Sequence, residues 1–390
     1  MKRSVSALYS RYVIDGAQMD CTPAQMLDDC MPAGEHEREE PETDFDSIVD
    51  EVVELAPRKA AYDHSGIMTY LERLTDIKDK ASIPATAAPG SFTRRKIASA
   101  LLATLWKKGH FTLEDLWVSL QWTWDSAPLG NMAAFYFSAE AAAQYLFDLG
   151  VRLDSYSFEK SQRVSAISVK VSVENTKDDK AESDYDFFNE QGGHESRELR
   201  YCWLSDEDKC GGKLVPSPSS WLIYIPFDTC EYRLGDSLFE KAAGMSGDSA
   251  PEIQDPDYFI DCFEVVRELT EDGVIMAGTA VGRGGLALAA ASMCGENTGI
   301  SIDISGIERA AKESDTVRIL FSEVPGVLIQ IQDADYDYMD SQLLLQDIAY
   351  FPLGHPSETA GIGFTHGRKG VSDILASLLQ GNIPEDDQDA

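Results

Sequence analysis

The chain has 390 residues, of which 43% are hydrophobic and 26% charged, so it is long enough to form two packed domains. Its formal net charge of −34 creates a long-range field that repels phosphate backbones and anionic lipid headgroups. We therefore expect neither nucleic acid nor a membrane as a partner. Any phosphate-binding site needs a local concentration of N–H donors or basic side chains.

Seven cysteines are spread along the chain without a close CxxC pair, which favours reduced thiols. Cys202 and Cys210 flank an acidic loop, but no second pair completes a four-ligand zinc set, so we expect no metal site there. The N-terminal residues lack the apolar core of a signal peptide, and no apolar stretch of about 18 residues occurs. The sequence indicates a cytoplasmic protein.

Residues 1–85 are predicted to form an acidic segment that is helical and partly disordered. Within it, residues 31–45 combine Pro, Gly and carboxylates with almost nothing to bury, which is typical of a linker. The apolar side chains of residues 45–74 recur with helical period on both sides of Pro57, which predicts two amphipathic helices. A Pro/Ala/Gly connector at 82–91 marks a domain boundary.

The next segment begins with a helix that we expect to run from an N-cap at Thr93 to Gly109. Residues 118–124 alternate apolar and polar side chains, which is the period of a half-buried strand. An alanine-rich helix then extends from Met132 to a C-cap at Gly150. These patterns predict an α/β subdomain.

The remaining residues alternate strand and helix patterns around two acidic stretches. We expect an exposed insertion at 174–198, and a helix between the last two strands of the following set. The predicted strands are 166–173, 221–225, 274–276, 300–304 and 327–331, and the predicted helices are 256–270, 286–293 and 371–379, the last before an acidic tail. This alternation argues for α+β or α/β layers and against a helical bundle.

A cluster of glycines follows the predicted strand at 274–276. Gly278, Gly282, Gly284 and Gly285 surround Arg283 and precede a helix, so free N–H groups at the helix N-terminus could hold a phosphate. Arg283 would add a fork of donors. The spacing matches neither GxGxxG nor the P-loop motif. The alternative is that the glycines only allow close packing of helix against strand.

A rare basic patch, Arg94, Arg95 and Lys96, lies at the start of the helix predicted from Thr93. Cations at a helix N-terminus oppose the macrodipole, so this placement is consistent with binding a phosphate. The alternative is a solvated face whose cations are attracted to neighbouring acids.

Five segments resemble the formylglycinamidine ribonucleotide (FGAM) synthase family, in the family's order. Residues 271–293 resemble its "I-x-x-x-H-D-x-S-D-G-G-L-x-x-x-L-x-E-M" region. Residues 221–225 with 234–237 resemble its strand and "L-G-G-S" turn, and 320–329 its "L-F-x-E-x-x-G-R" strand. Residues 302–304 and 348–354 resemble further strands. The resemblance covers about a third of the chain.

The resemblance implies an α+β, AIR-synthase-like fold, with an N-terminal α/β subdomain at 86–218 and a C-terminal layered α/β sheet subdomain at 219–390. Aminoimidazole ribonucleotide (AIR) synthase and its relatives share ATP-dependent activation of an oxygen atom as a phosphate. ATP or ADP, and with it Mg²⁺, are therefore the implied cofactors. A homodimer that pairs N-terminal subdomains is the implied assembly.

This chain departs from the family where chemistry is concentrated. It has Ala277 and Gly278 in place of His-Asp, and Arg283 in place of the acid of Ser-Asp-Gly-Gly. Glu323 matches the glutamate of the family's "L-F-x-E-x-x-G-R" strand. Its role could be conformational or chemical. We expect a catalytically weakened protein that binds a nucleotide, a phosphorylated metabolite or a partner chain. The alternatives are an active ATP-dependent ligase component in purine biosynthesis and a structural interaction module.

Overall fold

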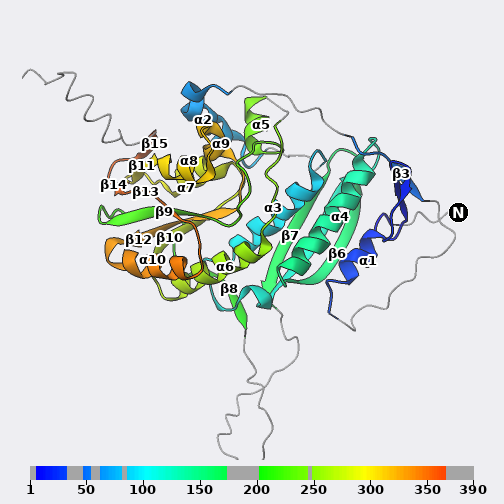
Figure 1. Ribbon diagram of the computed structural model, residues 1–390, viewed down its shortest axis with the longest axis horizontal. Coiled ribbons are helices and arrows are strands. Elements are labelled where there is room, and N and C mark those ends of the chain that lie inside the picture. The colour runs from blue at the N-terminus through cyan, green and yellow to red at the C-terminus, as the bar shows by residue number, and fades with distance from the viewer. Residues whose placement is uncertain are drawn as a thin grey trace, which may run out of the picture.

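Figure 1 shows the computed structural model of the chain, in which an N-terminal and a C-terminal α+β half lie side by side. The structure describes residues 6–32, 47–53, 62–80, 86–173, 202–244 and 248–365. The linker predicted beyond residue 32, the insertion at 174–198 and the helix at 371–379 lie outside these ranges.

The N-terminal half is built on a three-stranded sheet with the order β6–β5–β7. The central strand β5 (Leu116–Asp125) pairs parallel with β6 (Arg152–Ser161) and antiparallel with β7 (Ala166–Val173). Helices α3 (Pro89–Leu102) and α4 (Asn131–Asp148) pack against each other and cover one face (Figure 1). The strands predicted at 118–124 and 166–173 and the alanine-rich helix are confirmed.

The alternation of apolar and polar side chains along β5 follows from the burial of one face of the strand. Trp122 and Trp124 are fully buried on the helix-covered face and meet the ring of Phe135 edge-on. The Nε1 of Trp122 donates to Ser138 Oγ at 2.9 Å, and the Nε1 of Trp124 donates to the carbonyl of Asn131 at 2.7 Å. Both indole N–H groups are thus satisfied within the core, as buried polar groups must be.

The C-terminal half is built on a four-stranded sheet whose central strands are buried on both faces. Helices lie on both sides of it, with α6 and α10 on one face and α7, α8 and α9 on the other (Figure 1). The sheet order is β10 (Ile275–Val281), β12 (Gly326–Gln332), β9 (Ser220–Pro226) and β13 (Phe351–Gly354). The helices are α5 (Leu238–Ala243), α6 (Pro256–Glu271), α7 (Gly285–Met293), α8 (Ser305–Ala311), α9 (Thr316–Phe321) and α10 (Tyr336–Leu345). A smaller sheet has the order β14 (Pro356–Ser357), β11 (Gly299–Asp303) and β15 (Gly361–Thr365).

Two details of the C-terminal half differ from expectation. The strand predicted at 274–276 continues to Val281, because its whole length pairs with β12. The single helix predicted between the strands at 300–304 and 327–331 is two short helices, since Lys312 adopts φ 53 and ends α8.

The N-terminal segment folds differently from the prediction of two helices. Its elements are β1 (Tyr12–Ile14), β2 (Ala17–Gln18), α1 (Pro23–Asp28), β3 (Ile48–Asp50) and α2 (Ile67–Ile77). The second predicted helix is confirmed as α2. The first is wrong, because Ile48–Asp50 pairs parallel with β1, a distant partner that helical periodicity does not reveal.

Asp50 shows what this strand contributes to the fold. Its buried carboxylate accepts the amides of Gly130, Met132 and Ala133 at 2.8, 2.8 and 3.0 Å. These amides lie at the N-terminus of α4, where intrahelical acceptors are missing and negative charge is favoured. The N-terminal segment therefore caps the longest helix of the N-terminal half.

The helix predicted from Thr93 to Gly109 has different ends. It begins at Pro89, and Thr93 is a buried interior residue whose hydroxyl lies 2.7 Å from Ser138 Oγ. The helix ends at Leu102, because the chain turns into β4 (Lys107–His110), which pairs with β8 (Trp203–Asp208).

The division of the chain at residues 86 and 219 stays a prediction. The buried apolar side chains of the two halves form one continuous cluster. Within the described ranges, no helix combines the length and apolar character needed to cross a membrane.

Arg267 joins the two halves. Its buried guanidinium extends from α6 toward β4 and the connector that precedes it. It donates to the carbonyls of Leu105 and Lys107 at 2.9 and 2.7 Å, and to that of Gly109 at 2.9 Å. Glu271 supplies the countercharge at 2.7 Å. This geometry fixes the connector against α6.

Replacing Arg267 with Met should lower the free energy of unfolding by about 3 kcal/mol, because buried carbonyls lose their donor. The matched control is Arg309→Met, which removes an exposed guanidinium bonded to the carbonyl of Ser305 and should change stability by about 0.5 kcal/mol or less. Urea denaturation measures both. Equal losses would show that Arg267 does not hold the halves together.

Candidate functional site

The glycine turn connects β10 to α7. Gly284 and Gly285 have φ angles of 84 and 70, in the left-handed region that favours glycine. A Cβ atom on Gly285 would lie 2.7 Å from the carbonyl of Leu320 and from the backbone of Phe321 in α9. The close approach of α7 to α9 therefore requires glycine, and packing explains this position.

Gly278 lies inside β10 and not in the turn, which corrects the sequence prediction. Its amide donates to the carbonyl of Gly211 at 2.9 Å. A Cβ atom here would lie 2.3 Å from the ring of Trp106. The indole packs directly on the strand, so Gly278 also serves packing.

Glu323 follows α9 and occupies the position where an anion at the glycine turn would lie. Its buried carboxylate accepts the amide of Gly284 at 3.0 Å, the amide of Leu238 at 2.8 Å and Nη1 of Arg95 at 2.9 Å. The amide of Gly285 donates to the carbonyl of Gly282 at 2.8 Å. The amides of Gly284 and Gly285, expected to be free, therefore already have internal acceptors.

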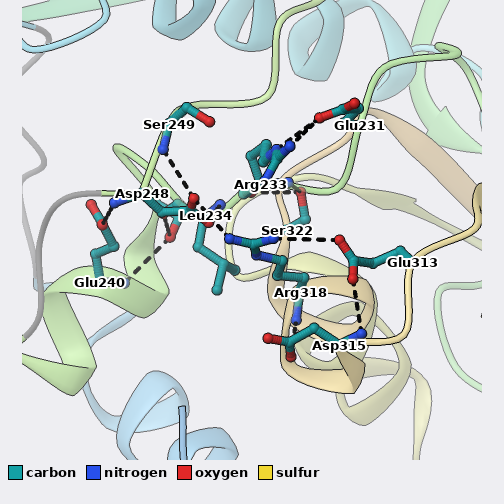
Figure 2. Close-up of polar contacts among 11 residues, drawn as sticks. Glu231, Arg233, Leu234, Glu240, Asp248, Ser249, Glu313, Asp315, Arg318 and Ser322 are labelled. Atoms are coloured by element: carbon teal, nitrogen blue, oxygen red, sulfur yellow. Dashed lines mark hydrogen bonds and ion pairs between the residues drawn. The ribbon is translucent and has the colours of Figure 1, made fainter. Parts of the chain in front are cut away.

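Figure 2 shows a polar network that joins Leu234 and Asp248 to Arg318 and Ser322. Leu238, which follows the turn at 234–237, donates its amide to Glu323. Asp248 accepts the amide of Leu234 at 3.1 Å and Nη2 of Arg318 at 3.1 Å. Ser322, next to Glu323, donates to the carbonyl of Arg233 at 2.7 Å. These contacts tie the turn to α9 and hold the Glu323 carboxylate in place.

A cleft of about 600 Å³ opens between α3, β7, α7 and the end of α2. Five basic side chains line it, from three separate parts of the chain: Arg95 and Lys96 of α3, Arg283 of the glycine turn, and Lys78 and Lys80 after α2. Among the described residues, Asp79 and Glu323 are the carboxylates of the lining, which leaves three net positive charges in this part of the chain. In a chain of net charge −34, this is a local reversal of sign.

Lys96 is the half-buried cation at the centre of this cluster. Burial lowers the pKa of its ammonium below the usual value, and the charges of Arg283 and Arg95 lower it further, while Glu323 opposes them. Its Nζ lies 5.5 Å from the ring centre of Phe92, and it has no hydrogen-bond acceptor among the described residues. Nε of Arg95 is likewise buried without a partner in this part of the chain. An anion in the cleft would offset this repulsion.

The remaining walls combine hydroxyl and apolar groups. Ser99 and Ser292 provide hydroxyls, and Phe92, Ile167 and Leu288 provide apolar surface. Such a lining suits a ligand with an anionic end and an apolar or aromatic body.

Arg94 does not share the cleft with its neighbours. It donates to the carbonyl of Ile253 at 3.0 Å and to Gln144 Oε1 at 3.2 Å. Lys107 and Lys108 form ion pairs with the Asp208 and Glu207 side chains of β8. These contacts are what the solvated-face alternative describes for Lys107 and Lys108, and Arg94 has protein partners away from the cleft. The patch also lies in the second turn of α3, so the macrodipole argument for it was wrong.

The sequence brought out Arg95, Lys96, Gly282 and Arg283, all of which line the cleft, but it missed Lys78, Lys80, Ser99 and Ile167. The two lysines follow α2, Ser99 lies in α3 and Ile167 lies in β7, and no local sequence pattern marks these residues. Among the described residues, no group of three or more His, Cys, Asp or Glu side chains is placed to hold a metal ion.

Residues 234–337 match the protein family described as AIR synthase related protein, C-terminal domain. This part of the chain is similar to that domain, and the chain has the α+β architecture expected from the resemblance.

Curated proteins that are similar to this chain include FGAM synthases. A probable phosphoribosylformylglycinamidine synthase, chloroplastic/mitochondrial, from Arabidopsis thaliana is 22% identical over 71% of this chain and 19% of its own length. Phosphoribosylformylglycinamidine synthase from Homo sapiens is 23% identical over 37% of this chain and 10% of its own length. The chain thus spans less than a fifth of either relative.

Solved structures that are similar to part of this chain include phosphoribosylformylglycinamidine synthase II from Thermotoga maritima. It is 13% identical with a TM-score of 0.48, over 79% of this chain and 44% of that one. PurL from Thermotoga maritima complexed with ATP is 12% identical with a TM-score of 0.42, over 77% of this chain and 40% of that one.

Replacing Gly285 with Ala should lower the free energy of unfolding by about 3 kcal/mol, because left-handed strain adds to a backbone clash with α9. Gly273→Ala is the matched control, since Gly273 has φ 74 and open space around its Cα, and should cost about 1 kcal/mol. Urea denaturation compares the two. If the variants lose equal stability, packing does not explain the glycine at 285.

Proposed function

We propose that this chain is a catalytically weakened FGAM-synthase-like protein that binds a nucleotide or another phosphorylated metabolite in the cleft between α3 and the glycine turn. The observation that carries the proposal is the convergence of Arg95, Lys96 and Arg283 on one cleft in a strongly acidic chain. Purine biosynthesis is the proposed setting, because the curated relatives are FGAM synthases.

The cations supply what a phosphate group needs. An arginine presents a planar fork of donors that matches phosphate oxygens, and a lysine adds a compact charge. Burial lowers the pKa of Lys96, and the charges of Arg283 and Arg95 lower it further while Glu323 opposes them. A phosphate between the cations would relieve their repulsion. The apolar wall formed by Phe92, Ile167 and Leu288 offers a surface for a base or sugar.

Two features support the loss of catalysis. Arg283 stands where the family motif has an acid, so a group that would hold a metal or polarise a substrate is replaced by a cation. Glu323 keeps the family's position, but its carboxylate is bonded to Arg95 and to the amides of Gly284 and Leu238. Such a carboxylate positions the turn and has little freedom to accept a proton from a substrate.

The implied homodimer belongs to the same proposal. Among the described residues, β6 pairs only with β5, so it forms an edge of the N-terminal sheet. An edge strand has backbone donors and acceptors on one side that a second copy of the chain could pair.

Isothermal titration should detect binding of ADP. Lys96→Met and Arg283→Gln should each weaken binding about tenfold or more, because each removes a charged donor to phosphate. Lys108→Met is the control, since Lys108 pairs with Glu207 outside the cleft and should leave affinity unchanged. Absence of heat at millimolar ADP and ATP would remove the nucleotide from the proposal. An equal loss of ADP affinity in Lys108→Met would show that the cleft is not the binding site.

Supplied with formylglycinamide ribonucleotide, ammonia, ATP and Mg²⁺, the purified chain should release no ADP above background, because the acid replaced by Arg283 is missing. A coupled assay for ADP measures this, with an active FGAM synthase as positive control. Turnover by this chain would instead support the active ligase component.

A further inference from the structure

Building on the proposed function, we infer that the cleft takes its phosphorylated ligand without a divalent metal ion, as a free nucleoside diphosphate whose charge is neutralised by protein cations. Lys96 and Arg283, together with Arg95, would neutralise the phosphate charge at this site. At a site rich in carboxylates, a bound metal ion does this.

The donor set of the cleft does not fit Mg²⁺. Magnesium takes oxygen ligands in a near-octahedral arrangement and is usually held by one or two carboxylates together with phosphate oxygens. The two carboxylates that line the described part of the cleft are Glu323 and Asp79. Asp79 is exposed beyond the end of α2, between two lysines.

Glu323 cannot take up a metal without losing its present partners. Its Oε1 accepts the amides of Leu238 and Gly284, and its Oε2 accepts Nη1 of Arg95 at 2.9 Å. A metal ion on this carboxylate would face the guanidinium of Arg95 at short range. It would also leave that buried cation without its counter-ion, which is a costly arrangement.

The cations point to the same conclusion. Lys96, Arg95 and Arg283 line the same cleft. Burial lowers the pKa of the Lys96 ammonium, and the charges of Arg283 and Arg95 lower it further against the opposing effect of Glu323. A divalent cation placed among these groups would add to the repulsion, whereas a bare diphosphate would reduce it. Coordination of Mg²⁺ to ADP neutralises much of the phosphate charge before the ligand reaches the cleft, so the magnesium complex is the weaker ligand.

Titration of the full chain with ADP in EDTA, and again in excess MgCl₂ at matched ionic strength, tests the inference. The dissociation constant should be about fivefold or more higher with Mg²⁺ than with EDTA. Binding that appears only with Mg²⁺, or that is equal in both buffers, would overturn the metal-free site while the proposed function stands. Absence of binding in both buffers would overturn both.

A charge reversal at the turn gives an independent test. Arg283→Asp restores an acid at this position of the motif, so it should weaken binding of ADP in EDTA at least about tenfold. Lys108→Asp, a charge reversal outside the cleft, should change it less than about twofold. Thermal melting checks that each variant is folded, and Arg283→Gln replaces Arg283→Asp if the acid prevents folding. Unchanged affinity for free ADP in the folded variant would contradict the inference.

Discussion

The buried carboxylate of Glu323 connects three parts of the molecule that lie far apart in sequence. It bonds Arg95 of α3, the amide of Leu238 at the start of α5 and the amide of Gly284 before α7. A buried carboxylate needs donors, and a buried guanidinium needs a counter-ion, so these elements must keep their relative positions. The cleft lies beside this contact and is lined by Arg95, Glu323 and Arg283, so its shape depends on the same interaction.

Carboxylates fulfil the same role elsewhere in this acidic chain. Asp50 caps α4, Asp236 accepts the amide of Ala88 before α3, and Asp228 accepts the amides of Gln254 and Asp255 before α6. Burial raises the pKa of both Asp228 and Asp236, while these amide bonds counteract it. Internal acids thus occupy helix N-termini that could otherwise attract phosphate. The capacity of the cleft to bind an anion therefore resides in its cationic side chains.

Elements with a strong local pattern could be predicted from the sequence. The alternation of β5 and the composition of α4 follow from which side chains are buried, and Gly150 ends α4 with φ 66 as its position indicated. The errors came from distant partners. Ile48–Asp50 is a strand because β1 lies beside it, and Thr93 is interior because its hydroxyl meets Ser138. Sequence periodicity carries no information about either contact.

The sequence by itself determined that glycines surround an arginine between a strand and a helix, and that basic residues are rare enough for a cluster of them to be notable. Only the tertiary structure decided which of these basic residues lie together in one cleft. Successive residues of a helix are about 100° apart, so Arg94 turns toward Ile253 while Arg95 and Lys96 line the cleft with Arg283. It also decided that the Gly284 amide serves Glu323, because packing α7 against α9 brings that carboxylate to the turn.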